Sequence, residues 1–177
     1  YSLTHAEKLG EVAPAGEVSK AIPVAMPMSE QRSHLRISLI PHLLEVAEYN
    51  RKRRRERLAL FEIGKVFLTD EERLTRLPEE RWHLAGLCCG AAPLPHWTGE
   101  EAAERDFFYV KGVVDAILAE LGVGEAEWVP EEGLQGMHPG RTASIWLGKQ
   151  LLGFAGQLHP ELEKRYELGQ TVLFQLD

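Results

Sequence analysis

Cysteine is scarce in this chain, and its placement is typical of neither a disulfide framework nor a metal site. The 177 residues include two cysteines, Cys88 and Cys89, which are adjacent. Neighbouring side chains of a strand point to opposite faces, so these two thiols are poorly placed to bond each other. No further ligand stands beside them at metal-site spacing. We interpret both as reduced, buried, small apolar residues of an intracellular protein.

Long apolar runs and low-complexity segments are absent as well. No stretch approaches the roughly 20 apolar residues that span a membrane, and residues 1–10 lack the apolar core of a signal peptide. Four Trp, six Phe and four Tyr are spread along the chain, which excludes low-complexity disorder. The net charge of −7 argues against a chain that mainly coats nucleic acid. We expect a cytoplasmic protein with a buried core and no membrane partner.

The signature motifs of common enzymes are missing too. The sequence contains no Gly-rich phosphate loop, no G-x-S-x-G nucleophile motif and no H-E-x-x-H zinc motif. Its seven histidines are scattered, and no two carboxylates stand at a spacing typical of general acid–base catalysis. Motifs alone therefore predict no catalytic, cofactor-binding or metal-binding residue.

Apolar periodicity is what the chain does contain, and it predicts more strands than helices. Residues 58–68 are the strongest strand, where Gly64 indicates a bulge or a close approach of the backbone. Residues 142–147 and 151–158 form a hairpin across Gly148 and Lys149. Further strands are predicted at 1–3, 21–26, 82–89, 126–129 and 171–176. This pattern indicates an α+β fold, an antiparallel sheet with helices packed mainly on one face.

Three helices are expected between the strands. Ser38 is the predicted N-cap of the first, which ends in a basic run at 51–55. Asp106 caps the second, and Gly122 ends it; the third covers 160–166, and segments 13–16 and 91–104 are expected loops. The basic run is interpreted as a solvated helix end, with nucleic-acid binding as the alternative.

Six segments, taken in order, carry a resemblance to a known family. They are PMSE at 27–30, LRISLIPHLL at 35–44, LFEIGKVF at 60–67, DFFYVKG at 106–112, HPGRTA at 138–143 and GQLHPE at 156–161. Together they resemble the catalytic-like core domain of the bacterial phenylalanyl-tRNA synthetase beta subunit, over nearly the whole chain. The family commonly has an Asn before the first segment, where this chain has Met26.

The resemblance implies a class II aminoacyl-tRNA synthetase-like core, related to that of biotin and lipoate ligases. It implies that residues 1–177 are one domain of a longer, multi-domain beta subunit. In this family the alpha subunit carries aminoacylation, with ATP and Mg, in an (αβ)₂ heterotetramer that contacts tRNA(Phe) mainly through other domains. The implied function is a non-catalytic module of phenylalanine-tRNA ligase that supports assembly, with no cofactor of its own.

One position supports the loss of catalysis. Class II enzymes grip the ATP α-phosphate with an arginine that, by the resemblance, would stand at Leu68. A leucine side chain can neither neutralise nor hydrogen-bond a phosphate. Residues 169–177, where the resemblance expects a further arginine, contain none. We therefore expect this domain to catalyse nothing by itself.

The remaining candidate residues belong to a pseudo-site or an interface. Arg36 and Glu62 are expected to form a structural ion pair, with contact to a partner subunit as the alternative. His138 and Arg141 either line the remnant of an amino-acid pocket or belong to an exposed Pro-Gly turn. Apolar surface left by missing neighbours favours an interface role for two leucines of the first helix, Leu43 and Leu44.

Two other functions remain open on the sequence. An autonomous acyl-adenylate ligase of the biotin- or lipoate-attaching type would need a basic, Gly-rich loop, and none is found. A stand-alone nucleic-acid-binding module would use the arginines at 51–55, and its affinity would fall steeply with salt.

Overall fold

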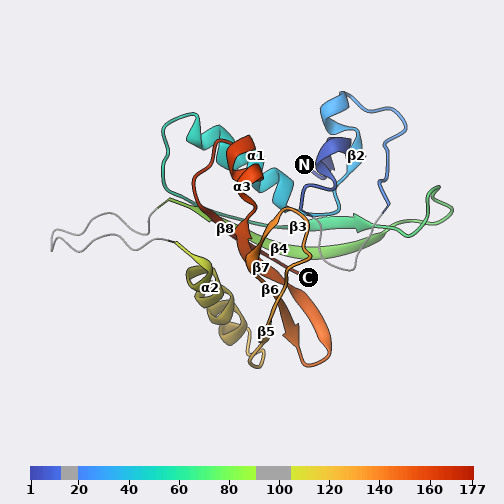
Figure 1. The fold of residues 1–177 in the computed structure, drawn as a ribbon. Coiled ribbons are helices and arrows are strands. Elements are labelled where there is room, and N and C mark those ends of the chain that lie inside the picture. The colour runs from blue at the N-terminus through green and yellow to red at the C-terminus, as the bar shows by residue number, and fades with distance from the viewer. Residues whose placement is uncertain (13–19, 91–104) are drawn as a thin grey trace.

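A six-stranded antiparallel sheet forms the centre of the molecule (Figure 1). The computed structural model describes residues 1–12, 20–90 and 105–177. The strands lie in the order β3-β4-β8-β7-β6-β5. Their bounds are β3 Leu58–Leu68, β4 Glu79–Cys89, β5 Glu127–Pro130, β6 Met137–Leu147, β7 Gln150–Leu158 and β8 Thr171–Leu176. The short strands β1 (Leu3–Thr4) and β2 (His34–Leu35) pair separately.

Helices cover both faces of the sheet. The helices α1 (Ile40–Arg51) and α3 (Pro160–Arg165) lie on one side, and α2 (Phe107–Glu120) lies on the other (Figure 1). Two 3₁₀ turns, η1 (Ala6–Lys8) and η2 (Glu30–Arg32), lie in the N-terminal part. The predicted α+β class, an antiparallel sheet flanked by helices, is confirmed. The expectation that helices pack mainly on one face is wrong, because α2, the longest helix, covers the other face. Within the described ranges, no helix is long and apolar enough to cross a membrane.

The central strand β8 explains why the fold has two apolar layers. All six of its residues are buried, because helices lie over both of its faces. Leu173 belongs to the cluster beneath α1, whereas Val172 and Phe174 belong to the cluster beneath α2. Successive strand side chains alternate between faces, so an apolar strand in the middle of the sheet serves both clusters.

Most local sequence signals agree with the structure. The Asp106 side chain accepts a hydrogen bond from the Tyr109 N–H at 3.0 Å and caps α2 as predicted. Gly122 follows α2 with φ at 66°, a value that favours glycine. The β6–β7 hairpin turns at Gly148 and Lys149, as predicted. The expected loops at 13–16 and 91–104 lie outside the described residues.

The strand predicted at residues 21–26 is wrong. In this segment Pro23 forms an isolated bridge with His34, and Met26 is exposed. Proline has no N–H to donate to a ladder, so the segment is poorly suited to continuous pairing. The apolar side chains at 21–26 indicated a buried strand, but Ile22 is the only buried one among them.

The start of α1 is buried and is tied to β8. Leu39 is the N-cap residue, one position later than predicted, and the Ser38 hydroxyl accepts a hydrogen bond from the Ile40 N–H at 3.2 Å. The Gln175 Oε1 atom accepts from the Ser38 hydroxyl at 2.8 Å and from the Leu39 N–H at 2.9 Å. A strand side chain thus satisfies two donors that the buried helix start would otherwise leave unpaired.

We predict that Gln175→Leu lowers the free energy of unfolding by about 2–3 kcal/mol, because it leaves two buried donors unsatisfied. Urea-induced unfolding of the chain measures the change. The control is Gln150→Leu, at an exposed position beside the β6–β7 turn, with an expected change below about 0.5 kcal/mol. Equal effects of the two substitutions would contradict the assigned role of Gln175.

Candidate functional site

Leu68, where the resemblance expects a phosphate-binding arginine, is buried in apolar surroundings. Leu68 is the last residue of β3, and 8% of its surface is exposed. Its side chain belongs to the cluster beneath α1, together with Val66 and Leu39. Hydrocarbon there provides neither a cation nor a donor for a phosphate. This end of β3 therefore contributes to the core.

The two leucines expected at an interface lie inside the domain. Leu43 is 4% exposed and Leu44 is fully buried, both in the cluster beneath α1. The expectation that missing neighbours would leave these two side chains as apolar surface is corrected, because β3 and β4 already cover this face of α1. The helical spacing of Leu43 and Leu44 marks a core stripe.

Arg36 and Glu62 form the expected ion pair, with 2.5 Å between Arg36 Nη1 and Glu62 Oε1. Arg36 is 5% exposed, and its Nε donates to the Lys65 carbonyl at 2.8 Å. The pairing of β3 with β4 runs without interruption, so the bulge predicted at Gly64 is wrong. The close approach predicted there is present, but the approaching group is a side chain: a Cβ atom at Gly64 would lie 2.2 Å from Arg36 Nη2.

His42 completes this buried cluster. Its Nδ1 lies 3.3 Å from Arg36 Nη1, and its Nε2 lies 3.1 Å from the Leu3 carbonyl. The same Nε2 lies 3.2 Å from Arg32 Nη1, which also donates to the Leu3 carbonyl at 2.9 Å. Arginine can only donate, so both ring nitrogens face cationic donors, a setting that disfavours a protonated ring. Burial, and then the neighbouring Arg36 charge, lower the pKa of His42 below its ordinary value of 6.5. The ring is therefore neutral near pH 7.

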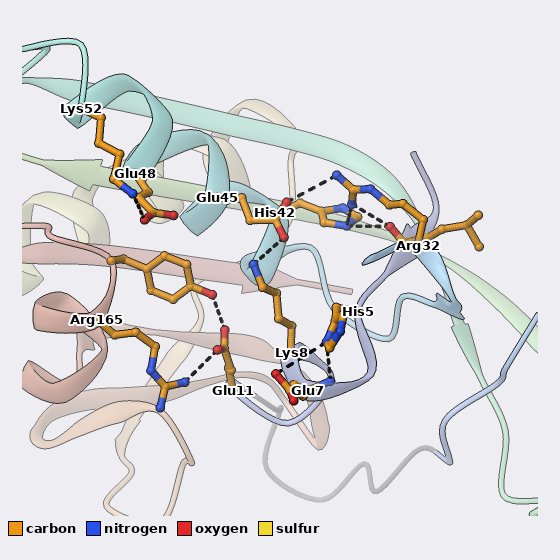
Figure 2. Close-up of polar contacts among 12 residues, drawn as sticks. His5, Glu7, Lys8, Glu11, Arg32, His42, Glu45, Glu48, Lys52 and Arg165 are labelled. Carbon is orange, nitrogen blue, oxygen red and sulfur yellow. Dashed lines mark hydrogen bonds and ion pairs between the residues drawn. The ribbon is translucent and has the colours of Figure 1, made fainter. Parts of the chain in front are cut away.

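Ion pairs fasten the N-terminal segment over the same side of the sheet (Figure 2). Lys8 contacts Glu45 of α1 at 2.6 Å. Glu11 accepts from Arg165 of α3 at 2.9 Å and from the Tyr166 hydroxyl at 2.5 Å. These contacts join the segment to two helices, and they lie above an apolar cluster that includes residues of the same segment. This side of the sheet is thus covered by the chain itself.

His138 and Arg141 lie in an irregular stretch of β6. The pairing of β6 with β7 shifts register between Met137 and Thr142. The His138 Nδ1 accepts from the Gly140 N–H at 3.1 Å, which is turn geometry, and His138 does not line the cavity beside it. The exposed Arg141 lines that cavity, of about 640 Å³, and its Nη1 donates to Gln157 at 2.7 Å. Of the two residues predicted together, only Arg141 therefore lines the cavity.

An apolar groove on the opposite face of the sheet was not predicted from the sequence. It encloses about 380 Å³ between α2 and the strands β3 and β4. Two of its lining side chains on β3 are largely exposed, Phe61 at 74% and Ile63 at 61%. Trp82 of β4, which pairs with Lys65 in the sheet, is 63% exposed but does not line the groove. The signal was present, because both alternating sets of β3 side chains between residues 58 and 63 are largely apolar. Apolar patches of this kind mark contact surfaces.

The basic run after α1 is partly neutralised. Lys52 pairs with Glu48 at 2.5 Å, one turn earlier. The Arg53 guanidinium lies 3.3 Å from the centre of the Tyr49 ring. The interpretation as a solvated helix end therefore accounts for two of the five cations. For metals, the described part of the chain contains no group of three or more His, Cys, Asp or Glu side chains that could hold an ion.

We predict energetic coupling between Arg36 and Gly64. Gly64→Ala is expected to cost about 1–3 kcal/mol of unfolding free energy, because the new methyl group displaces the guanidinium from Glu62. In an Arg36→Ala background the same change should cost at least about 1 kcal/mol less. Urea unfolding of all four proteins measures the coupling.

Gly112→Ala is the matched control for this cycle, because nothing lies within 4 Å of a Cβ atom at Gly112 in the middle of α2. It should leave stability unchanged or raise it by about 0.5–1 kcal/mol. Additivity of the Gly64 and Arg36 substitutions would show that the guanidinium does not occupy the space above the glycine.

We also predict a pH dependence that belongs to His42. The pKa of His42 is lower in the folded state than its unfolded value near 6.5. The unfolded chain therefore binds the proton first as the pH falls. The free energy of unfolding decreases below about pH 6.5, by at most about 1.4 kcal/mol per pH unit. His42→Gln retains a donor and an acceptor but cannot titrate. Unfolding measured from pH 7 to pH 5 should show a smaller slope for the variant, and an unchanged slope would refute the assignment.

Comparisons with known proteins identify relatives of the chain. A family model described as the phenylalanyl-tRNA synthetase beta chain CLM domain matches residues 1–177. The phenylalanine–tRNA ligase beta subunit of Halalkalibacterium halodurans is 48% identical over 177 residues, which are 100% of this chain and 22% of that protein. The same subunit of Bacillus subtilis is 45% identical over 178 residues, covering 100% of this chain and 21% of that protein.

A solved structure is similar in fold. The pyrrolysyl-tRNA synthetase of Desulfitobacterium hafniense aligns with a TM-score of 0.68 at 18% identity, covering 99% of this chain and 57% of that one. This likeness confirms the class II synthetase-like fold. The chain spans about a fifth of the length of the curated relatives it matches. Since the family model covers every residue and relatives reach 48% identity over the full chain, the chain belongs to the phenylalanyl-tRNA synthetase beta chain CLM domain family.

Proposed function

We propose that this chain is the non-catalytic core module of a phenylalanine-tRNA ligase beta subunit. It is one domain, residues 1–177, of a longer protein, and it supports assembly with the alpha subunit for ATP-dependent charging of tRNA(Phe). The holoenzyme is an (αβ)₂ heterotetramer of the cytoplasm, in which tRNA contacts lie mainly in other domains. The names of the relatives support this proposal. They give no support to an autonomous biotin- or lipoate-type ligase.

The burial of Leu68 carries the proposal of a non-catalytic role. In the position of a phosphate-binding arginine, the chain has hydrocarbon packed beneath α1. The fixed cation that stabilises charge during acyl transfer is therefore missing at this place. ATP and Mg accordingly act on the alpha subunit. The buried cation Arg36 is already paired with Glu62.

The apolar groove supports an assembly role. Phe61, Ile63 and Trp82 project from adjacent strands on the face that α2 leaves open. Their exposure in this chain favours a protein surface that covers them in the assembled ligase. β3 is also an outer strand of the six-stranded sheet, with Arg36 bound to its edge at Lys65 and Phe67. An outer strand next to an apolar patch suits a protein contact. We propose that the groove is the packing surface of the module.

We predict that Phe61→Ser combined with Ile63→Ser in the full-length beta subunit weakens assembly with the alpha subunit by at least about tenfold. Two exposed apolar side chains lost from an interface justify this magnitude. Size-exclusion mass and phenylalanylation activity measure the effect. Leu74→Ser, an exposed residue in the β3–β4 connection, is the control and should leave both unchanged.

Two further measurements separate the parts of the proposal. The first is hydrogen exchange of β3, measured in the full-length beta subunit alone and in its complex with the alpha subunit. Protection that appears only in the complex shows that the alpha subunit covers the groove, and protection already present in the beta subunit alone shows that the beta subunit itself covers it. Titration calorimetry of the beta subunit with ATP should show no binding that Leu68→Ala alters. ATP binding that this substitution changes would overturn the non-catalytic role, whereas loss of alpha-subunit association in the wild type would overturn the assembly role.

A further inference from the structure

A second polar cavity lies at the end of the sheet remote from Leu68. It encloses about 440 Å³ where α1 ends, β3 begins and β4 ends. Among the described residues that line it, three are arginines, Arg51, Arg57 and Arg105, and one is acidic, Glu56. The volume lies in the range of small-ligand sites. Leu58 and Leu68 bound the eleven-residue strand β3, so this cavity is roughly 34 Å from the Leu68 end.

Arg105 is held in place with an unused donor. Its Nη1 donates to the Leu58 carbonyl at 2.6 Å, which fixes the guanidinium against the start of β3. Its Nε is buried and has no hydrogen-bond partner among the described residues. A buried, unpaired N–H costs free energy, and such groups in native proteins commonly serve a ligand or an ordered water. Arg105 is therefore an oriented cation with remaining donor capacity.

The other arginines are also without carboxylate partners. In the described part of the chain, neither Arg51 nor Arg57 forms an ion pair within 4.0 Å. Both line the cavity. Cations at a helix C-terminus complement the helix dipole, which accounts for Arg51 but not for Arg105, which comes from a separate segment.

Convergence of these cations is unfavourable without a counterion. The chain as a whole carries a net charge of −7, yet among the described residues that line this cavity there are three arginines and one acidic residue. Arg51 and Arg105 both act to lower the pKa of the Cys89 thiol in the cavity wall, against a larger, opposite effect of burial. The local field is thus positive in an acidic protein, which favours an anionic ligand.

We propose that this cavity binds the phosphate group of a ribose phosphate ester, from a nucleotide or from RNA. Guanidinium groups match phosphate oxygens in geometry and charge, and three of them surround the space. Glu56 is also a lining residue, and a carboxylate there would accept a hydrogen bond from a sugar hydroxyl, so we propose a ribose phosphate rather than inorganic phosphate. The site is separate from the buried Leu68 end and is independent of the proposed assembly role.

Titration calorimetry of the full-length beta subunit tests the site. The probes are inorganic phosphate, adenosine 5′-monophosphate and a short oligoribonucleotide without a terminal phosphate, each at constant ionic strength set with potassium chloride. Arg57→Gln should weaken ribose-phosphate binding about fivefold or more. Arg57 is exposed and makes no ion pair, so the fold should tolerate this change. Arg73→Gln, which removes the same charge from an exposed loop, should change affinity less than about twofold.

Chemical protection locates the ligand without a substitution. Phenylglyoxal modifies accessible arginines, and mass spectrometry of the peptides should show that the better nucleotide probe protects Arg51 and Arg57 but not Arg73. Tighter binding of the monophosphate assigns a free nucleotide, and tighter binding of the oligonucleotide assigns an RNA backbone. The proposal is overturned by absence of binding at constant ionic strength, by equal losses in Arg57→Gln and Arg73→Gln, or by equal protection of all three arginines.

Discussion

The packing of α1 against the sheet is the constraint on which the rest of the structure depends. The helix begins inside the protein, where its free N–H groups have no access to water. Gln175 of the central strand accepts from Leu39 N–H and from the Ser38 hydroxyl, and so sets where the helix starts. With its start held there, α1 places Leu44 in the cluster that also contains Leu68.

Filling this face with hydrocarbon decides what the domain can do. The charged groups that remain on it neutralise one another: Arg36 pairs with Glu62, and His42 is neutral. The side of the sheet beneath α1 is closed by the chain itself, while the apolar groove on the other face stays open. The surfaces that remain available for interaction are therefore the apolar groove that contains Phe61 and the arginine-lined cavity at the start of β3.

Much of the fold could be predicted, because its signals are local. The cap at Asp106 and the turn at Gly148 depend on a few neighbouring residues, and both were correctly placed. The site was less accessible. Arg51 was visible in the basic run at 51–55, but Arg57 lies outside that run, and the contribution of Arg105 depends on a segment nearly fifty residues away in the sequence. No local sequence pattern indicates that Arg105 lies close to Arg51 and Arg57.

The sequence by itself determined the alternation of strands and helices, the family resemblance and the leucine at position 68. These follow from periodicity, turn chemistry and residue identity, which act over short distances. Only the tertiary structure decided that Leu43 lies in the core, that Gly64 makes room for Arg36, and that 21–26 is not a strand. Each of these outcomes depends on which distant segment covers a residue, and burial is a property of the packed chain as a whole.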